Sequence, residues 1–266
     1  MKIFICGSIS IKKLSDSSIK NLKNIMQKNY TVLVGDALGV DLNIQKFYND
    51  NEYNNVVVYH INDFPRNKIC DKFQSKKCNF DEKLEDKNNK EREKQTFKDE
   101  KMVQDCDFFY CIWDGKSKGS YTNIKKAIDS KKTFIKIECD EKEYVYYNNG
   151  AINNNSYTLT MLKNKIDEIF EKNNGYSLKE VFDILKEENA QHKIKFDDFK
   201  KNLVKAKLLE VLEKDKKVVY CPVEKRYGIE NLYKGKPSSY RYTGEFIDLA
   251  RKVFDVNYKE PSLFSC

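Results

Sequence analysis

Residues 112–124 read IWDGKSKGSYTNI, and the letters GKS at 115–117 are those that end a phosphate-binding P-loop. A P-loop also needs a glycine five positions before the GKS glycine, because its backbone N–H groups must wrap around the phosphate before the lysine arrives. That position is Tyr110, so the sequence excludes a nucleoside-triphosphatase P-loop. What remains is an apolar run ending at Trp113, a loop of glycine, lysine and serine, and polar residues that can open a helix.

Two earlier apolar runs also end in loops of small polar residues. The three loops contain Gly7, Ser8 and Ser10 in the first, Gly35, Asp36, Gly39 and Asp41 in the second, and Asp114, Gly115, Lys116, Ser117, Gly119 and Ser120 in the third. Glycine lets a backbone approach a ligand closely, and serine hydroxyls with unpaired helix N–H groups bind phosphate or hydroxyl oxygens. Each loop alone also fits an ordinary turn. Three of them at one sheet edge predict a ligand site.

The loops belong to an alternation of strands and helices over the first 140 residues. Short runs rich in β-branched and aromatic residues predict buried strands at 2–6, 31–35, 56–60, 108–113 and 133–137. Amphipathic stretches predict helices near 16–29, 40–53, 92–106 and 120–131. This alternation predicts an α/β, Rossmann-like parallel sheet with helices on both faces, which binds ligands at the carboxyl ends of its strands.

Three stretches carry a resemblance to a known family: GSIS, GDALGVDLNIQKFY and FKDEKMVQDCDFFYCIWDGKSKGSYTNIKKAI. Through them, residues 1–140 resemble the SLOG superfamily, and within it the YspA-like or YpsA-like domains. The resemblance implies a Rossmann-like domain that binds a nucleotide or nucleotide-derived ligand; some members cleave N-glycosidic bonds and others act as ligand sensors. It also implies that Gly7 and Ser8 contact the ligand, that the glycines and aspartates of the second loop shape the site, and that residues 114–120 hold phosphate. Such domains often dimerise, so a homodimer is expected.

One position departs from the hydrolytic members of that superfamily. They carry a glutamate shortly after the glycine of the last loop, where a carboxylate acts as nucleophile or stabilises positive charge on the sugar. This chain has Asn123 there, and an amide can do neither. Asp36, Asp41, Asp99 and Asp114 are alternative carboxylates, although Asp41 can cap a helix and Asp99 is expected on an exposed, charged helix. We therefore predict a ligand-binding module, with a nucleotide N-glycosidase or phosphoribohydrolase as the alternative.

Residues 62–100 interrupt the alternating pattern with a long stretch that is dense in both signs of charge. Such a composition predicts a solvated insertion. The alternative is a lid over the ligand, in which Arg66 and Arg92 reach its phosphate.

An Asn- and Gly-rich stretch at 146–157 predicts a boundary between two domains, 1–145 and 158–266. Later patterns predict helices at 158–172, 177–189, 196–208 and 243–255, and a β-ribbon around 209–229. Ser177 and Glu180 have the spacing of a capping box. This order predicts a small α+β winged-helix-like domain, which more loosely resembles the C-terminal domain of phage antirepressors of the KilA-C type.

The second domain holds most of the excess positive charge. Residues 193–241 contain 14 Lys and Arg against 7 Asp and Glu, a net +7, close to the +8 of the whole chain. A phosphate backbone attracts such a surface, so Lys216, Lys217, Lys225 and Arg226 are predicted to bind nucleic acid. Net charge predicts association and not specificity, so a protein partner and an oligomerisation role remain alternatives.

Composition limits the other classes of protein. No apolar run approaches the roughly 20 residues that span a bilayer, and MKIFICGSIS lacks the regions of a signal peptide, which predicts a cytoplasmic protein without a membrane partner. The 8 cysteines form no CxxC pair, so we expect reduced thiols and no metal site. No cofactor is predicted beyond the nucleotide-type ligand.

Overall fold

The computed structural model describes residues 1–80, 90–148, 156–189, 193–214, 217–233 and 236–256. The chain forms two compact units, which we call the N-terminal unit, Met1–Asp167, and the C-terminal unit, Glu168–Cys266. Of the stretch predicted as a domain boundary, residues 149–155 lie outside the described residues.

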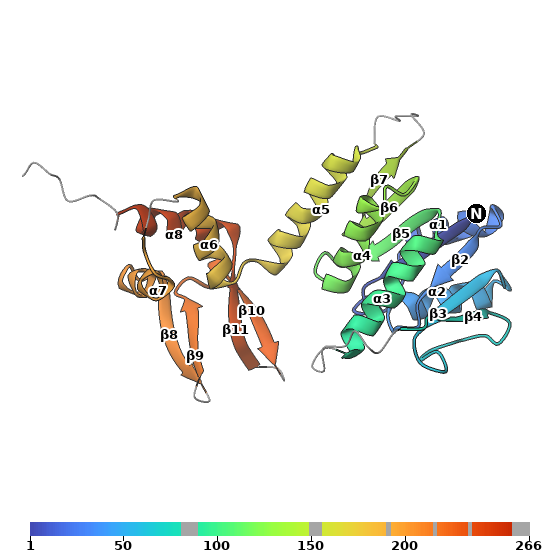
Figure 1. Ribbon diagram of the computed structural model, residues 1–266, viewed down its shortest axis with the longest axis horizontal. Coiled ribbons are helices and arrows are strands. Elements are labelled where there is room, and N and C mark those ends of the chain that lie inside the picture. The colour runs from blue at the N-terminus through green and yellow to red at the C-terminus, as the bar shows by residue number, and fades with distance from the viewer. Residues whose placement is uncertain (81–89, 149–155, 190–192, 215–216, 234–235, 257–266) are drawn as a thin grey trace, which may run out of the picture. The chain divides into compact units, whose positions relative to one another are not determined.

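A seven-stranded sheet in the order β4-β3-β2-β1-β5-β6-β7 forms the centre of the N-terminal unit (Figure 1). Its strands are β1 (Lys2–Gly7), β2 (Thr31–Val34), β3 (Val56–His60), β4 (Gln74–Lys77), β5 (Phe108–Trp113), β6 (Phe134–Cys139) and β7 (Lys142–Tyr147). The first six strands are parallel, and β7 pairs antiparallel with β6. Every residue of β5 is buried, as a central strand covered on both faces requires. The predicted α/β class with a mostly parallel sheet is confirmed.

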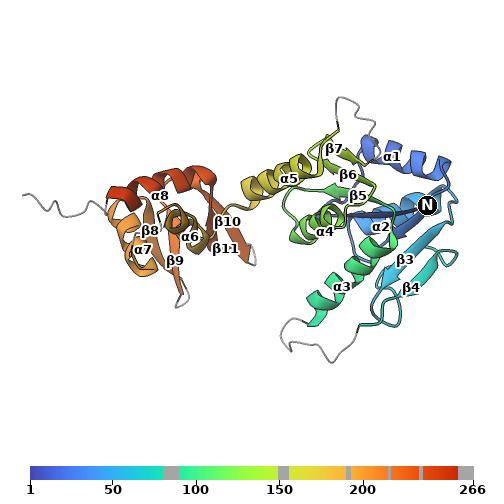
Figure 2. The same ribbon diagram turned by 45° about the horizontal axis from the view of Figure 1, so that its top comes forward.

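Helices cover both faces of this sheet. They are α1 (Asp16–Gln27), α2 (Val40–Asp50), α3 (Lys90–Asp105) and α4 (Lys118–Asp129). Apolar residues of α1 and α2, including Leu22 and Ile44, share a core cluster with Ile3 and Val32 of the sheet. The chain moves outward from β1 in one direction through β2 and β3, and in the other direction through β5 and β6. Right-handed crossovers therefore place α1 and α2 on one face and α3 and α4, which lie together in Figure 2, on the other.

The predicted strands and helices of the first 140 residues are all present, with ends that shift by a few residues. Two edge strands were not predicted. β4 has the sequence QSKK and all its residues are exposed, so it carries no apolar pattern. β7, with the sequence KEYVYY, begins before the Asn-rich stretch and buries only Tyr144. It reaches into residues that the composition indicated as a domain boundary.

Helix α5 (Leu159–Asn174) follows, and the division between the two units falls inside it. Its first half buries Leu162 and Ile166. Asp167 accepts hydrogen bonds from Tyr121 Oη at 2.6 Å and from Lys125 Nζ at 2.9 Å, which attaches this half of α5 to α4.

The C-terminal unit contains helices and two antiparallel hairpins. Its elements are α6 (Leu178–Glu188), α7 (Phe196–Lys205), β8 (Leu209–Lys214), β9 (Lys217–Pro222), β10 (Gly228–Tyr233), β11 (Lys236–Tyr242) and α8 (Gly244–Val256). β8 pairs with β9, and β10 pairs with β11. The single predicted ribbon is thus the first of two hairpins, and a short 3-10 helix, Lys225–Tyr227, lies between them.

One core holds the helices of the C-terminal unit together. Phe182 of α6, Phe199 of α7 and Phe254 of α8 pack with centroid separations of 5.3 to 6.3 Å. The predicted capping box of α6 is confirmed, since Ser177 and Glu180 exchange hydrogen bonds between side chain and backbone. Among the described helices of the chain, none is long and apolar enough to cross a membrane.

Candidate functional site

A pocket lies in the N-terminal unit where the carboxyl ends of β1, β2 and β5 meet α3 and the start of α4. The chain reverses its direction of progress between β1 and β5, and parallel sheets bind ligands at such a switch point. The pocket measures about 620 Å³, counting space open to solvent, and is lined by Phe4, Cys6, Gly7, Ile9, Ala37, Asp41, Arg66, Gln95, Lys98, Asp99, Met102, Ser117, Gly119, Ser120 and Asn123. Six of these, Gly7, Asp41, Ser117, Gly119, Ser120 and Asn123, were predicted from the sequence.

The first loop places Gly7 in the pocket wall and Ser8 behind it. Ser8 is fully buried, and its hydroxyl accepts the N–H of Asp114 at 3.1 Å and lies 3.4 Å from Ser120 Oγ. Ser8 therefore joins the first loop to the third and is not in the lining of the pocket. Ser10 is exposed and donates to Asp114 Oδ2 at 2.5 Å, which ties the same two loops together nearer the surface.

Asp114 organises the third loop. Its Oδ1 accepts the backbone N–H groups of Lys116 at 2.9 Å and Ser117 at 2.8 Å, and Gly115 between them has a φ of 72°. Burial disfavours the charged form of Asp114, but these bonds and the Ser10 hydroxyl outweigh it and lower its pKa. The carboxylate of Asp114 thus holds the turn that precedes α4.

Helix α4 begins directly after this turn and directs its first turn at the pocket. Its N-cap, Ser117, makes no capping hydrogen bond to the first-turn N–H groups. Gly119 lines the pocket, and a Cβ atom added there would meet nothing within 4 Å beyond its chain neighbours and its own helix backbone, so this flank of the first turn is open. Lys116 and Lys118 are exposed beside it. An uncapped helix start with a glycine in its first turn can bind an anion through backbone N–H groups.

The second loop is pressed against the first. Gly39 has a φ of 74°, and a Cβ atom there would lie 2.5 Å from the backbone of Ile9. A Cβ atom on Gly35 would lie 2.4 Å from Asp41 Oδ2. A larger residue at Gly39 would therefore require the backbone to move, whereas one at Gly35 would require only the Asp41 side chain to shift. The predicted helix cap by Asp41 is wrong: Gly39 is the N-cap of α2, and Asp41 instead accepts the N–H of Ala37 at 3.2 Å.

Asp36 carries the strongest charge network of the site. Arg66 binds both of its carboxylate oxygens, at 2.8 and 3.2 Å, and Lys98 Nζ lies 2.9 Å from Oδ1. Asp36 and Lys98 are only 1% and 2% exposed. Burial alone would raise the pKa of Asp36, but Arg66 and Lys98 hold it well below its usual value. Asp36 therefore stays ionised and serves as the anchor of both cations.

Helix α3 supplies pocket residues that sequence analysis did not assign to the site. Lys98 is buried, and Asp99 lines the pocket with its side chain 25% exposed, so the expectation of an exposed Asp99 is wrong. The missed signal was the helical spacing. Lys98 and Asp99 stand four residues before Met102 and Val103, which are both buried, and residues four apart share one face of a helix.

Asn123 and Asp99 form a pair across the pocket wall. Asn123 Nδ2 donates to Asp99 Oδ2 at 2.9 Å, so the amide of α4 fixes the orientation of a carboxylate on α3. Burial raises the pKa of Asp99, partly offset by Lys98 and Asn123. Burial also raises the pKa of Asp41 to about 7, again partly offset by Lys98. The inner wall thus holds two carboxyl groups whose pKa values burial raises.

The segment 62–100, predicted as a solvated insertion with a lid over the ligand as the alternative, places its two arginines differently. Arg66 lines the pocket, where it is bound to Asp36 and to Gln95 Oε1 at 3.0 Å. Arg92 is exposed on α3 and is not among the pocket residues. Residues 81–89 of this segment lie outside the described residues.

Of the four residues predicted to bind nucleic acid, the three that the structure describes lie near the two ends of one strand. Lys216 lies outside the described residues, and Lys217 begins β9. Lys225 and Arg226 follow the other end of β9, about 17 Å away at the usual rise per strand residue. Both are exposed, and Arg226 lies over the Tyr227 ring and binds Glu224 at 2.9 Å.

Compared with known proteins, the chain matches no protein-family model, no curated protein and no solved structure. The SLOG-like and KilA-C-like resemblances therefore remain predictions, and the function is argued below from the site.

Proposed function

We propose that the N-terminal unit is a SLOG-like domain that binds a nucleotide or nucleotide-derived molecule, with its phosphate at the first turn of α4. The observation that carries this proposal is the uncapped start of α4 at the pocket mouth, with Gly119 facing open space. Backbone N–H groups and the positive end of the helix dipole bind phosphate at such positions. Lys116 and Lys118 add positive charge at the same rim.

The inner pocket suits the uncharged part of such a ligand. Its walls combine the apolar side chains of Phe4 and Met102 with the polar groups of Asp41, Asp99 and Asn123. Carboxyl and amide groups hydrogen-bond to sugar hydroxyls and to the edges of bases. Eight of the 15 lining residues are polar or charged, a larger share than in the mostly apolar walls of most small-molecule sites, which suits a ligand that carries hydroxyl groups and ring nitrogens.

Gly119→Asp tests the proposal. The new carboxylate would occupy the space where phosphate is proposed, while an acidic residue in the first turn of a helix is otherwise favourable, so the fold is kept. Calorimetry against nucleoside mono- and diphosphates should show binding that falls at least tenfold in Gly119→Asp.

The matched control is Gly244→Asp. Gly244 begins α8, and a Cβ atom there likewise meets nothing within 4 Å. This variant should bind as the unchanged protein does. If a nucleotide binds and Gly119→Asp leaves its affinity intact, the phosphate lies elsewhere.

The alternative function, an N-glycosidase or phosphoribohydrolase, is favoured by one observation. Although Asn123 replaces the glutamate of hydrolytic relatives, Asp99 brings a carboxylate to the pocket beside it. We nevertheless propose binding, because Asn123 replaces the catalytic carboxylate and its amide donates to Asp99 Oδ2 at 2.9 Å, which engages that oxygen as a hydrogen-bond acceptor. Incubation with nucleoside monophosphates should release no base above background. Base release that Asp99→Asn abolishes would establish the enzyme.

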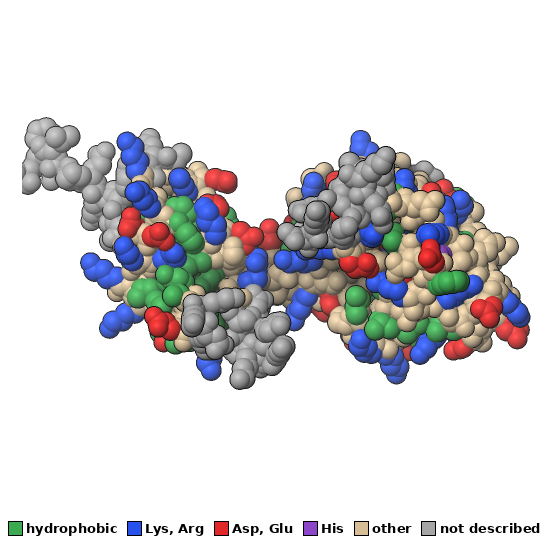
Figure 3. All heavy atoms as spheres, turned by 60° about the horizontal axis from the view of Figure 1, so that its bottom comes forward, with side chains coloured by type: hydrophobic (Ala, Val, Ile, Leu, Met, Phe, Trp, Pro, Cys, Tyr) green, Lys and Arg blue, Asp and Glu red, His purple; other side chains and the backbone are tan. Residues whose placement is uncertain are grey.

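For the C-terminal unit we propose a winged-helix-like module that contacts nucleic acid, with a protein partner as the alternative. We propose that these contacts respond to the ligand of the N-terminal unit. The order α6, α7 and the β8–β9 hairpin supports the proposal, with α8 packed against both helices. Lys201 and Lys205 are exposed one turn apart on α7, and Lys207 follows the helix. Figure 3 shows Lys and Arg side chains around this unit, bordering an apolar area. We also propose a homodimer, on the SLOG resemblance alone.

Charge reversal in two separate groups tests the nucleic-acid proposal on the full-length chain. One variant changes Lys201, Lys205 and Lys207 to glutamate, and the other changes Lys216 and Lys217. Fluorescence anisotropy with duplex DNA and single-stranded RNA should show binding that weakens with salt and is lost in at least one variant. Lys20→Glu with Lys23→Glu, both exposed on α1, is the control and should bind normally. Unchanged binding in both test variants, or none at low salt in the starting protein, favours a protein partner.

A further inference from the structure

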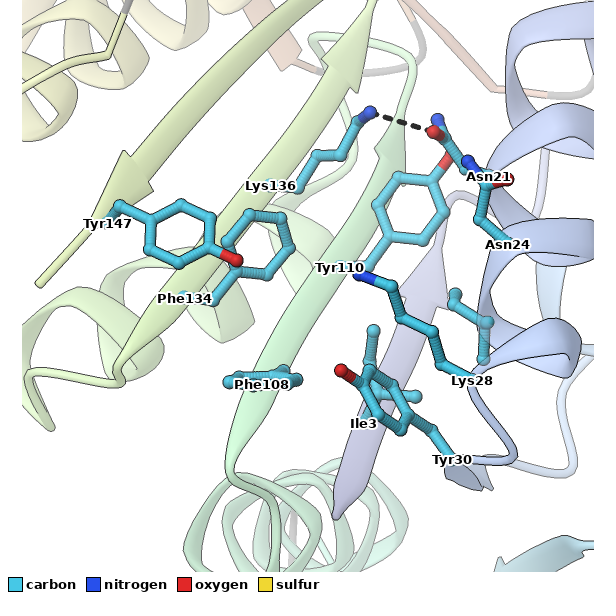
Figure 4. Close-up of a pocket in the computed structure, with 11 residues that line it drawn as sticks. Ile3, Asn21, Asn24, Lys28, Tyr30, Phe108, Tyr110, Phe134, Lys136 and Tyr147 are labelled. Atoms are coloured by element: carbon cyan, nitrogen blue, oxygen red, sulfur yellow. Dashed lines mark hydrogen bonds between the residues drawn. The ribbon is translucent and has the colours of Figure 1, made fainter. Parts of the chain in front are cut away.

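A second pocket lies at the opposite end of the sheet strands from the candidate ligand site. Phe108 and Phe134, the first residues of β5 and β6, line it, whereas the loop that holds Asp114 follows the last residue of β5. It measures about 590 Å³, counting space open to solvent. Figure 4 shows its side chains projecting from the strands and from α1 around a common space.

The topology explains why this part of the sheet is not covered. Right-handed crossovers place α3 and α4 on the other face, and hydrogen bonds attach α5 to α4. Helices α1 and α2 pack on this face against β1, β2 and β3. At one end of β6 and β7, α1 makes polar contacts: Ser18 donates to Glu138 at 2.7 Å, and Asn21 donates to Glu143 at 2.9 Å. Among the described residues, no helix follows α1 to cover the other end, which holds Phe134 and Tyr147.

Aromatic rings form the walls of the pocket. The strand register places Phe108, Phe134 and Tyr147 in one row on neighbouring strands, and Tyr30 stands beside Phe108. The Phe108 ring is inclined by 78° to Phe134 at 5.8 Å and by 55° to Tyr30 at 5.5 Å. Tyr147, 47% exposed, extends the row at 4.9 Å from Phe134. These rings border the pocket, which we call the slot.

The charged residues of the slot are both cations. Lys28 and Lys136 line it, and no carboxylate is among its lining residues. Lys136 is already occupied, with Glu143 at 2.8 Å and Asn21 at 2.9 Å. Lys28 is exposed, and no described carboxylate lies within ion-pair distance of it. The slot thus offers one uncompensated positive charge, with the Asn24 amide one helical turn away.

The charges of the slot distinguish between the classes of ligand that aromatic side chains can bind. A quaternary ammonium group fits aromatic cages, but Lys28 and Lys136 would repel it. A phosphate dianion is disfavoured more than a singly charged carboxylate, because Asn24 and Lys28 lie in and after the last turn of α1, where the partial negative charge of the helix repels an anion in proportion to its charge. We propose that the slot binds a small molecule with a flat aromatic ring and one carboxylate. The ring enters between Phe134 and Tyr30, and the carboxylate meets Lys28.

Four matched probes test the chemistry on the full-length chain by ligand-observed NMR: 2-naphthoate, cyclohexanecarboxylate, phenyl phosphate and benzyltrimethylammonium. Saturable binding of 2-naphthoate in the millimolar range or tighter is expected, as fits a fragment of this size. The other three should bind at least threefold more weakly. No binding of 2-naphthoate, or equal or tighter binding of any of the other three, overturns the proposal.

Two variants then locate the binding. Lys28→Ala should weaken 2-naphthoate about two- to fivefold, as for an exposed ion pair, and Tyr147→Ala about three- to tenfold, as for an aromatic contact. Lys23→Ala, exposed on the same helix but outside the slot, and Gly119→Asp should leave binding unchanged. If neither Lys28→Ala nor Tyr147→Ala has an effect, or if Gly119→Asp abolishes binding, the ligand binds elsewhere and the proposal is wrong.

Discussion

Replacement of Asp36 by asparagine should destabilise the N-terminal unit more than any surface substitution, because Asp36 neutralises a buried lysine. Lys98 is 2% exposed and its Nζ lies 2.9 Å from Asp36 Oδ1. Removal of one partner of a buried ion pair costs about 3–5 kcal/mol, since it leaves an uncompensated buried charge. Asp99, 4.0 Å from Lys98 Nζ, offers partial compensation. We therefore expect the lower end of that range, about 3 kcal/mol.

The single tryptophan makes this loss measurable in the correct unit. Trp113 is the only one in the chain and is buried in β5, so its fluorescence reports unfolding of the N-terminal unit. Urea titrations should give a free energy of unfolding lower by about 3 kcal/mol in Asp36→Asn. At about 2–4 °C per kcal/mol for a unit of this size, the melting temperature should fall by about 6–12 °C.

Two further variants separate this cause from general damage. Asp63→Asn removes an exposed ion pair with Lys77, in which Asp63 is 84% exposed, and should leave the urea midpoint close to that of the unchanged protein. Asp36→Asn combined with Lys98→Met removes both buried charges and should be more stable than Asp36→Asn alone. If Asp36→Asn unfolds at the same urea concentration as Asp63→Asn, the Asp36–Lys98 pair does not anchor the site as described.

Two other predictions concern the second loop. The pKa of Asp41 is raised from 3.8 to about 7 in the folded chain, so its protonated form stabilises the native state below about pH 4, and this stabilisation is lost as pH rises to about 7. Urea titrations across that interval should show that the free energy of unfolding declines with pH, and that Asp41→Asn reduces this decline. An equal decline in both proteins would contradict the role of Asp41. Gly39→Ala should lower the free energy of unfolding by about 1–3 kcal/mol, because φ at Gly39 is 74° and the new Cβ meets the Ile9 backbone. Gly119→Ala should be neutral or slightly stabilising in the same assay. Equal effects of the two substitutions would show that the loop around Gly39 relaxes.

The central strands and their helices could be predicted because their side-chain patterns repeat the geometry they adopt. FFYCIW becomes a strand with every residue buried. No such pattern marks β4, because QSKK pairs through its backbone at an exposed edge. Backbone pairing is indifferent to side-chain polarity, so an edge strand of this kind is invisible to any reading of hydrophobic alternation.

The loops at the edge of the candidate site could be predicted from the sequence, but the pairing of its buried charges could not. Glycines and serines after strands mark the pocket edge, since local turn chemistry requires them there. Lys98 and Asp36 stand 62 positions apart, and their pairing depends on how α3 packs across the strand ends. Sequence shows that both are charged, but only tertiary packing determines that they neutralise each other away from solvent.

That neutralisation fixes the direction in which the proposed ligand enters. Asp36 engages both cations that line the pocket, Arg66 and Lys98, so neither is left to meet a phosphate inside. The remaining inner carboxyls, on Asp41 and Asp99, have raised pKa values and would repel an anion whenever ionised. The outer rim, in contrast, has the uncapped start of α4 and the exposed side chains of Lys116 and Lys118. We therefore infer that a nucleotide-type ligand would enter with its sugar or base first and leave its phosphate at the mouth, where Gly119→Asp would meet it.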